Sequence, residues 1–249
     1  MLKRNTILLF VFVVMLSSVN AQVRPGIKAG YNIGGVMADR KDANQYQSPA
    51  NPNNFRMKSG FQVGMIADCP INDVLAIQPG ARFTMQGFID KYRTNEHMAP
   101  GSGQKATRRF SLFYLQVPVY AQYRWNVYEE TNVLFQAGPY FGYGLFGRQS
   151  YMRNGKSQDL NDSQKKISFG SGSSKDIRNG FDYGIGAGVG IEFFRFQVMA
   201  TYDFGLYKMD FEKNAKSGDY NIGMRNHNLS ITFAVIFGRR DPLQGKDSD

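Results

Sequence analysis

The sequence predicts an all-β protein, an eight-stranded antiparallel up-and-down transmembrane β-barrel. Two observations support this fold class. Long segments alternate between apolar residues and small or polar ones, as strands with two different faces do. The connections between these segments are alternately short and long. The clearest example is the hairpin of residues 181–207, in which a two-residue connection joins two alternating runs.

In this hairpin the odd positions from Phe181 to Phe193 are apolar, and the even positions between them hold Asp182, glycines and Glu192. After the connection, the apolar residues fall at even positions from Phe196 onward. Each strand is about twice the ~5–6 residues typical of soluble sheets and reaches the ~9–11 residues needed to cross a bilayer. The hairpin therefore favours membrane-spanning strands.

Eight segments share the alternation, and we expect strands at 23–33, 58–68, 74–89, 108–125, 131–147, 181–193, 196–206 and 225–237. Short connections fall near 69–73, 126–130 and 194–195, and long ones near 34–57, 90–107, 148–180 and 208–224. Outer-membrane barrels combine an even strand number with short periplasmic turns and longer outer loops. The order of the connections fits that architecture.

The N-terminus predicts the compartment. Lys3 and Arg4 precede an apolar run at 7–16, and the small residues Val19 and Ala21 follow it, as in a secretory signal peptide cleaved after Ala21. The alternative, a membrane anchor, is disfavoured because the run is much shorter than the ~20 residues of a spanning helix. We expect a signal peptide at 1–21, an outer-membrane barrel at 22–238 and a periplasmic tail at 239–249.

A soluble, lipocalin-like barrel with its apolar face inward is the alternative fold. The interior of an eight-stranded barrel is only just filled by side chains. About six large apolar residues per strand would overfill it, whereas the glycines of the other face leave room. We therefore place the apolar face outside. Aromatic residues near the strand ends would then form interfacial girdles: Phe61, Tyr123, Trp125, Phe135, Tyr143, Phe181, Tyr183, Phe193 and Phe196.

With this orientation, eight charged residues point inward as a candidate lumenal charge network: Arg24, Lys28, Arg82 and Arg124 with Asp68, Asp182, Glu192 and Asp203. Such charges should pair, because a buried charge without a partner is costly. Inward glutamines and tyrosines add hydrogen-bonding bulk. The set is either an ion pathway or a polar plug. Its balanced charge and large side chains favour a plug and predict no wide pore.

The formal net charge of +10 arises mainly from the long connections. Because the chain is exported, we expect no nucleic-acid partner. Basic loops suit the phosphates of lipopolysaccharide, although ordinary solvated charge explains them equally well. We expect outer-membrane lipids and the barrel-assembly machinery as partners. The basic residues are Arg40, Lys41, Arg56, Lys58, Lys91, Arg93, Lys105, Arg108, Arg109, Arg148, Arg153, Lys156, Lys165, Lys166, Lys175 and Arg178.

The sequence indicates no catalytic, cofactor-binding or metal-binding residues. The glycines at 184–190 recur every second residue of a strand with no helix after them, unlike a nucleotide-binding loop. A lipid-modifying barrel enzyme would need a nucleophile beside a histidine. His227 and Ser230 are three residues apart, on opposite faces of a strand, and His97 has no evident partner. Two histidines and the single Cys69 make no metal site.

Five segments together resemble the porin-family, PorT-like outer-membrane β-barrel proteins: AIQPG (76–80), YLQVPVYAQYRW (114–125), AGPYFGYGLFG (137–147), FDYGIGAGVGIEF (181–193) and MATYDFGLYKM (199–209). The resemblance spans nearly the whole mature chain. It implies an eight-stranded barrel without catalytic residues, and one branch of the family is associated with protein secretion and gliding. Such barrels often end on an aromatic residue, whereas Phe237 is followed here by GRRDPLQGKDSD.

Together these features favour a non-enzymatic outer-membrane barrel with a structural, surface-interaction or accessory role. Two alternatives remain open: a narrow passive channel and a lipid-modifying enzyme.

Overall fold

The computed structural model describes residues 23–38, 55–94, 104–159, 161, 165–170, 177–178, 180–211 and 222–238. Within these residues all strands belong to a single sheet. They are β1 (Arg24–Ala38), β2 (Phe55–Pro70), β3 (Leu75–Thr94), β4 (Gln104–Tyr128), β5 (Thr131–Arg153), β6 (Lys156–Ser157), β7 (Lys166–Ile167), β8 (Ile177–Arg178), β9 (Phe181–Phe193), β10 (Phe196–Gly205), β11 (Met209–Phe211) and β12 (Ile222–Ile236).

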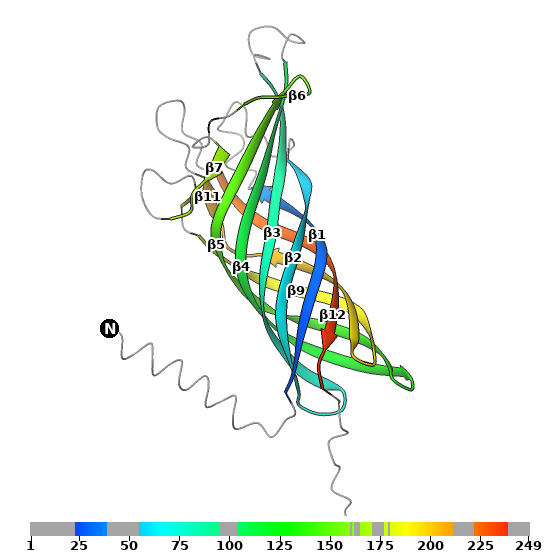
Figure 1. The fold of residues 1–249 in the computed structure, drawn as a ribbon. Helices are drawn as coiled ribbons and strands as arrows, with labels where there is room; N and C mark the ends of the chain where they lie inside the picture. Colours follow the sequence, from blue (N-terminus) through cyan, green and yellow to red (C-terminus); the bar gives the residue numbers. More distant parts are fainter. Residues whose placement is uncertain are drawn as a thin grey trace, which may run out of the picture.

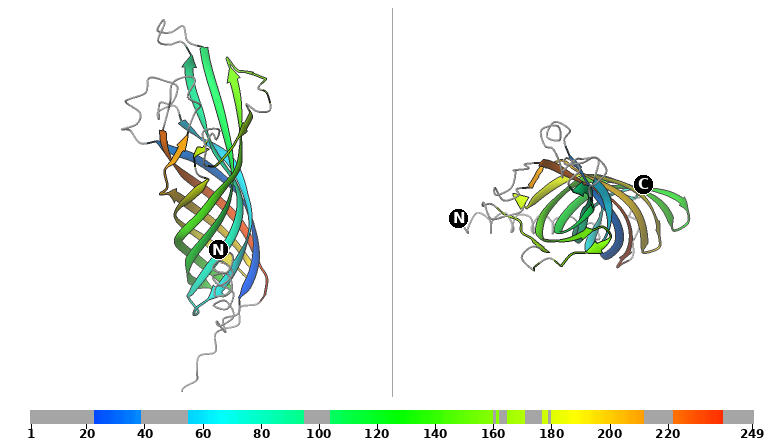
Figure 2. Two further views of the ribbon diagram at one scale, coloured as in Figure 1. Left: turned by 90° about the vertical axis from the view of Figure 1, so that its left-hand side faces the viewer. Right: turned by 90° about the horizontal axis from the view of Figure 1, so that it is seen from above.

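Among the described strands, the eight long ones close a ring in the order β1-β2-β3-β4-β5-β9-β10-β12 (Figures 1 and 2). Every neighbouring pair is antiparallel, and β12 returns to pair with β1 from Gly26↔Ile236 to Ala38↔Met224. The predicted eight-stranded antiparallel barrel is confirmed. The four short strands attach near one end of the ring: β6 and β7 pair with β5, β11 pairs with β12, and β8 pairs with β11.

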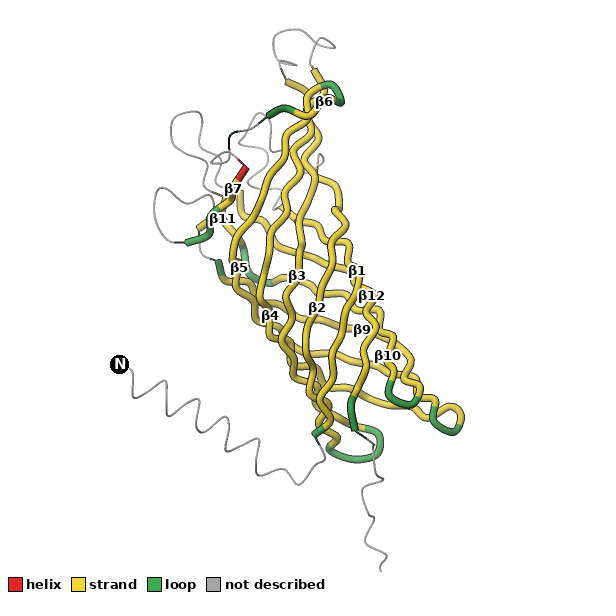
Figure 3. The backbone as a smooth tube through the Cα atoms, viewed as in Figure 1, coloured by secondary structure: helices red, strands yellow, loops and turns green. Residues whose placement is uncertain are grey.

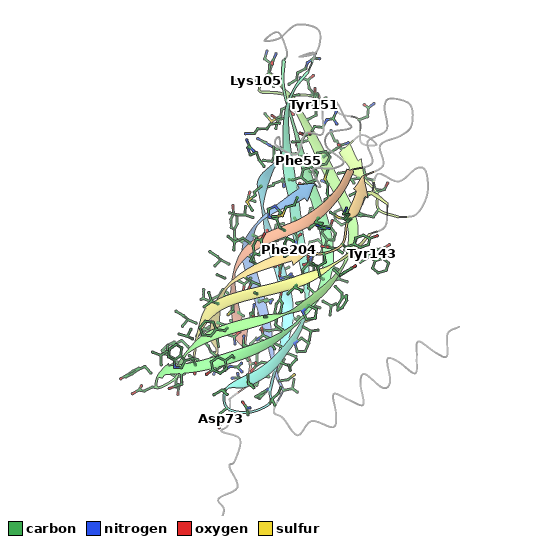
Figure 4. All side chains as sticks on the ribbon, turned by 180° about the vertical axis from the view of Figure 1, so that it is seen from behind. Phe55, Asp73, Lys105, Tyr143, Tyr151 and Phe204 are labelled. Carbon is green, nitrogen blue, oxygen red and sulfur yellow. The ribbon has the colours of Figure 1, made fainter. Side chains whose placement is uncertain are left out.

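The two ends of the barrel differ in their connections (Figure 3). At one end, short turns at 71–74, 129–130 and 194–195 join consecutive strands. The side-chain oxygen of Asn72 accepts hydrogen bonds from the backbone N–H groups of Val74 and Leu75 and so closes the first of these turns. We call this the short-turn end and the opposite end the long-loop end. Figure 4 labels Asp73 at the former and Lys105 and Tyr151 at the latter.

Several strands run further toward the long-loop end than the sequence pattern predicts. The ladder between β4 and β5 continues to Ala106↔Arg153, where an Asn154-Gly155 turn leads into β6. The predicted limits 108–125 and 131–147 are therefore wrong at this end. We call the projecting part of the sheet, 87–94, 104–111 and 147–157, the outer blade (Figure 1). Basic residues that the predicted strand limits left in the connections lie on strands instead: Arg56, Lys91, Arg93, Lys105, Arg148, Arg153, Lys156, Lys166 and Arg178.

The apolar face of the sheet points outward. In β9, for example, the exposed large side chains are those of Phe181, Tyr183, Ile185, Val189, Ile191 and Phe193, and the even-numbered residues between them face the interior. The soluble barrel with an apolar interior is therefore the wrong alternative. The nine aromatic residues predicted for the girdles are all exposed on this outward face. Tyr123, Trp125, Phe135, Phe193 and Phe196 lie toward the short-turn end, and Phe61, Tyr143, Phe181 and Tyr183 toward the long-loop end.

No helix in the described part of the chain has the length and apolar character to cross a membrane. Several sequence-based predictions fall outside the described residues: the signal peptide at 1–21, the tail at 239–249, and the positions of Arg40, Lys41, His97 and Lys175.

Candidate functional site: the filled lumen

The lumen near the short-turn end holds a four-residue ionic cluster, which we call the lower cluster: Arg24 of β1, Asp68 of β2, Arg124 of β4 and Glu192 of β9. Arg24 donates from Nε and Nη2 to Asp68 Oδ2, at 3.0 and 2.5 Å, and Arg124 Nη2 donates to Asp68 Oδ1. Arg124 Nε lies 3.4 Å from Glu192 Oε1. Two cations and two carboxylates balance, which is what burial at 0–4% exposure requires.

Glutamines extend the lower cluster across the barrel. Gln197 Nε2 of β10 donates to Glu192 Oε2 at 2.5 Å, and Gln78 Nε2 of β3 donates to Gln197 Oε1 at 3.3 Å. The Gln78–Gln197 bond links strands on opposite sides of the ring, because β3 and β10 are not neighbours in the sheet, whereas Gln197 and Glu192 are partners on adjacent strands. The polar contacts therefore bridge the lumen instead of lining one wall.

A second cluster, the central cluster, surrounds Arg82 of β3. Its Nη2 lies 2.7 Å from Asp203 Oδ2, and its Nε donates to Gln116 Oε1 at 2.8 Å. Tyr120 donates its hydroxyl to Asp203 Oδ1 at 2.8 Å, and the guanidinium carbon lies 5.9 Å from the centre of the Tyr140 ring. Both oxygens of the Asp203 carboxylate are thus bonded, which offsets part of the cost of burying the pair.

Lys28 and Asp182, the remaining two members of the predicted network, are buried in the lumen and form no ion pair with another described residue. Lys28 interacts electrostatically with Arg82 and Asp203 and so belongs with the central cluster. Asp182 Oδ2 accepts a hydrogen bond from Asn226 Nδ2 at 3.1 Å, and its Oδ1 has no hydrogen-bond partner among the described residues. The eight predicted charges therefore divide into two clusters and a separate carboxylate instead of one network.

The glycine row of β9 clears space for tyrosines and a carboxylate. A Cβ atom added at Gly186 would lie 2.5 Å from Asp203 Oδ1 and 2.7 Å from Tyr120 Oη, and one at Gly184 would lie 2.7 Å from the Tyr140 ring. The room that the inward glycines leave is occupied here by two tyrosines and a carboxylate. The Tyr120 and Tyr140 rings, from β4 and β5, lie over β9 because its inward glycines carry no side chains.

The interior changes character toward the long-loop end, where apolar side chains replace the polar ones. One group comprises Leu112, Tyr114, Ile167, Ile177 and Met209, with Phe110, Phe169 and Tyr207 packed against it. A second comprises Val36, Phe88 and Met224, with Phe55 and Phe110 against it. We call both together the apolar cap. The Phe88 and Phe110 rings stack at 4.6 Å between centroids.

Sequence reasoning missed the apolar cap. Ile167, Ile177 and Met209 lie in connections that were expected to be loops, and they reach the interior through the short strands β7, β8 and β11. The sequence did contain a signal for the cap. Phe88, Phe110 and Leu112 fall at inward-facing positions of β3 and β4, whereas the inward-facing positions nearer the short-turn end hold polar residues. Apolar residues at inward positions predict an interior contact with something other than water.

The lumen is not fully satisfied in its hydrogen bonding. Both side-chain polar atoms of Gln62, Gln122 and Asn228 are buried without a partner within the described residues. Buried amides of this kind are normally bonded to ordered water in a polar space that has room for it.

The histidine and serine considered for catalysis lie apart. Ser230 is buried in the lumen and bonds the Thr201 backbone oxygen at 3.3 Å, while His227 lies on the outward face beside Tyr202. In the described part of the chain, no group of three or more histidine, cysteine or carboxylate side chains is placed to hold a metal ion.

Residues 18–211 match the family model described as outer membrane protein beta-barrel domain. The chain belongs to this outer-membrane β-barrel family. Its β12 lies beyond the matched range and closes the ring against β1. Outer-membrane barrels have short periplasmic turns and longer outer loops, and by this general rule the short-turn end is the periplasmic one.

The fold is similar to three solved outer-membrane structures. These are Neisserial surface protein A (14% identity, 86% of this chain and 97% of that one, TM-score 0.36), the attachment invasion locus protein Ail of Yersinia pestis with the heparin analogue sucrose octasulfate (12%, 86% and 99%, 0.36), and AlkL in lipid bilayers (12%, 91% and 96%, 0.40). No curated protein matches the sequence.

Proposed function

We propose that this outer-membrane barrel is a closed, non-enzymatic scaffold that holds a surface structure, the outer blade, at the cell exterior. The observation that carries the proposal is the filling of the lumen by two cross-barrel ionic clusters below an apolar cap. The ionic clusters tie β1, β2, β4 and β9 together at one level and β3, β4 and β10 at another. A role in surface interaction or as an accessory component follows from a barrel that presents structure and conducts little.

The balance of charge supports a plug over an ion pathway. An ion pathway needs weak, exchangeable binding sites, because a tightly held ion cannot leave. In the lower cluster the carboxylates are instead bonded to arginines within the protein, with side chains at most 5% exposed. Separating these groups to admit an ion would leave buried charges without partners.

The finer family assignment also belongs to this proposal. The five sequence segments support the assignment of the chain to the PorT-like proteins, one branch of which is associated with protein secretion, and an accessory role of that kind is part of the proposal. The signal peptide with cleavage after Ala21, and delivery by the barrel-assembly machinery, complete the proposed route to the outer membrane. A lipid-modifying activity is the least supported alternative, because His227 and Ser230 lie on opposite faces of β12.

A narrow passive channel is the second candidate. It is favoured by the unbonded amides of Gln62 and Asn228, on β2 and β12, which suggest water along the β12–β1–β2 side of the lumen. Such a path would admit water or protons but no larger solute.

Planar-bilayer recording of the purified, refolded protein separates these functions. The closed scaffold predicts no stable openings, and a narrow water path predicts at most picosiemens events. Stable nanosiemens openings would contradict the proposal. Heat-modifiable migration on a gel confirms in the same sample that the barrel has folded.

A further inference from the structure

On β4 and β5 the outward face of the barrel changes from apolar to polar and basic across one row of aromatic rings. Phe61, Phe83, Phe113 and Phe146 form this row on β2 to β5, with ring centroids 6.4, 5.7 and 4.6 Å apart in that order. On β4 the outward positions from Trp125 to Phe113 are apolar or aromatic. They cover about 30 Å along the barrel axis at a rise of about 3.3 Å per residue and a tilt of about 40°. The row therefore marks the outer edge of the apolar band.

Directly above this row lie three exposed cations, which we call the basic patch: Arg109 of β4, Arg148 of β5 and Lys166 of β7. Arg148 stands opposite Ser111 on one side and opposite Lys166 on the other. Gly147 lies beside the buried Ile167, so Arg148 and Lys166 share the outward face. Arg109 pairs with Ile89 and Ser150, one step further out.

The basic patch has no internal counter-charge. Like charges directly opposite each other on neighbouring strands destabilise a sheet. Arg148 and Lys166 are such a pair. The described outward positions of β3, β4, β5 and β7 beyond the aromatic row hold no aspartate or glutamate. Ser111 and Ser150 place hydroxyls among the cations instead. Cations next to hydroxyls, with no carboxylate, suit a multiply charged oxyanion.

We propose that Arg109, Arg148 and Lys166 bind the phosphate groups of a phosphorylated glycolipid in the outer leaflet. Its acyl chains would lie against the apolar band, and its phosphates would meet the cations immediately beyond Phe113 and Phe146. Three cations within reach of one headgroup favour a lipid with two phosphates over a phospholipid with one. The inference rests on the outward orientation of the proposed scaffold, but it does not depend on whether the lumen is closed.

The test is a titration of the refolded protein in non-ionic detergent with bisphosphorylated lipid A, followed by native mass spectrometry. The variant Arg109→Gln/Arg148→Gln/Lys166→Gln should bind about a hundredfold more weakly, because each cation near an anionic lipid contributes about 1 kcal/mol, or about fivefold. A matched control, Arg153→Gln/Lys156→Gln/Arg195→Gln, removes the same charge from exposed positions elsewhere and should change binding less than about threefold.

Two further lipids show which chemical groups of the ligand the basic patch recognises. Dephosphorylated lipid A should bind the wild-type protein weakly, with the same affinity that the patch variant has for bisphosphorylated lipid A. If the wild-type protein bound both forms of lipid A equally well, the proposal would be overturned. Equal binding of phosphatidylglycerol would overturn the assignment to a glycolipid. Heat-modifiable migration shows that each variant is folded. Conductance of the same samples distinguishes the two proposals. A barrel that does not conduct and does not bind lipid A contradicts only this inference. A barrel that conducts and binds lipid A contradicts only the closed scaffold.

Discussion

The periplasmic half of the lumen and its outer end are filled by different chemistry from different parts of the chain. In the periplasmic half, charged and amide side chains of the ring strands meet across the barrel, as Arg24, Asp68 and Arg124 do. At the outer end the filling is apolar, and part of it comes from connecting segments, through Ile167, Ile177 and Met209. The first arrangement is built into the ring of strands, and the second is added to it.

This difference predicts two kinds of stability. A contact between ring strands contributes to the whole barrel, because all eight strands must form before the cluster closes. A contact of the apolar cap contributes mainly to the local free energy of opening of β7, β8 and β11, which each pair over only two or three residues.

The largest expected effect comes from leaving one ion of the central cluster unpaired. Asp203→Ala should lower the free energy of unfolding by about 3–5 kcal/mol, because Arg82 stays buried without its carboxylate. Urea titration of the refolded protein in lipid vesicles, read by gel mobility, measures the change. Asp159→Ala removes an exposed carboxylate from a connection and serves as control, with an expected change below about 0.5 kcal/mol. Equal effects of the two substitutions would mean that the ionic cluster does not stabilise the barrel.

A substitution in the apolar cap should act locally. Ile177→Ala removes a fully buried side chain and should lower the local opening free energy by about 3 kcal/mol. Limited trypsin digestion would then cut faster at Lys166 and Lys208, while the urea midpoint of the barrel stays unchanged. A parallel loss of the urea midpoint would contradict the division into two kinds of stability.

The glycine row gives a test at the level of single atoms. Gly186→Ala should cost about 2 kcal/mol, because its Cβ would overlap Asp203 Oδ1 and Tyr120 Oη. Gly34→Ala is the matched control, since its Cβ would meet only ordinary contacts at 3.4–3.5 Å. Urea unfolding of both variants decides the point, and a Gly186→Ala protein as stable as the control would show that the tyrosine does not lie over β9.

The smallest effect concerns a neutral hydrogen bond. Gln136 Nε2 of β5 donates to Thr201 Oγ1 of β10 at 2.8 Å, over Gly188 of the intervening β9. Thr201→Val keeps the shape of the side chain and removes the acceptor, which should cost about 1 kcal/mol in the same urea assay. If Thr201→Val lowered the free energy of unfolding as much as Asp203→Ala does, neutral and ionic contacts would contribute equally to stability, and the distinction between them would be lost.

The sequence pattern locates strands well where one face meets lipid. β9 was predicted at 181–193 and lies at Phe181–Phe193. It fails beyond the membrane, where outward positions such as Lys105 and Arg109 are polar and the apolar residues Phe110 and Leu112 face the interior instead. The row of outward apolar residues ends there although the ladder continues. The Asn154-Gly155 turn, with positive φ at both residues, was the available signal that β5 extends past 147.

The parity of the strands also predicted which charges face inward, but it could not predict their partners. Partners depend on how the tilted strands bring distant residues to one level, as for Arg82 and Asp203, which come from β3 and β10. Asp182 illustrates the limit, since its neighbour is Asn226 instead of a cation. Residues in long connections, such as Ile167 and Ile177, carry no strand parity that could assign them to the interior.

The central claim is that the lumen is filled by two independent layers, and conductance of variants tests it most directly. The polar layer consists of the lower and central clusters, and the other layer is the apolar cap. Four proteins are recorded in planar bilayers: the wild type, Asp68→Ser/Arg124→Ser/Arg82→Ser/Asp203→Ser in the polar layer, Leu112→Ser/Ile177→Ser in the apolar cap, and all six substitutions together. We predict that the wild type and each single-layer variant stay silent and that the combined variant alone conducts. Stable openings of the wild type, or of the apolar-cap variant by itself, would contradict the account.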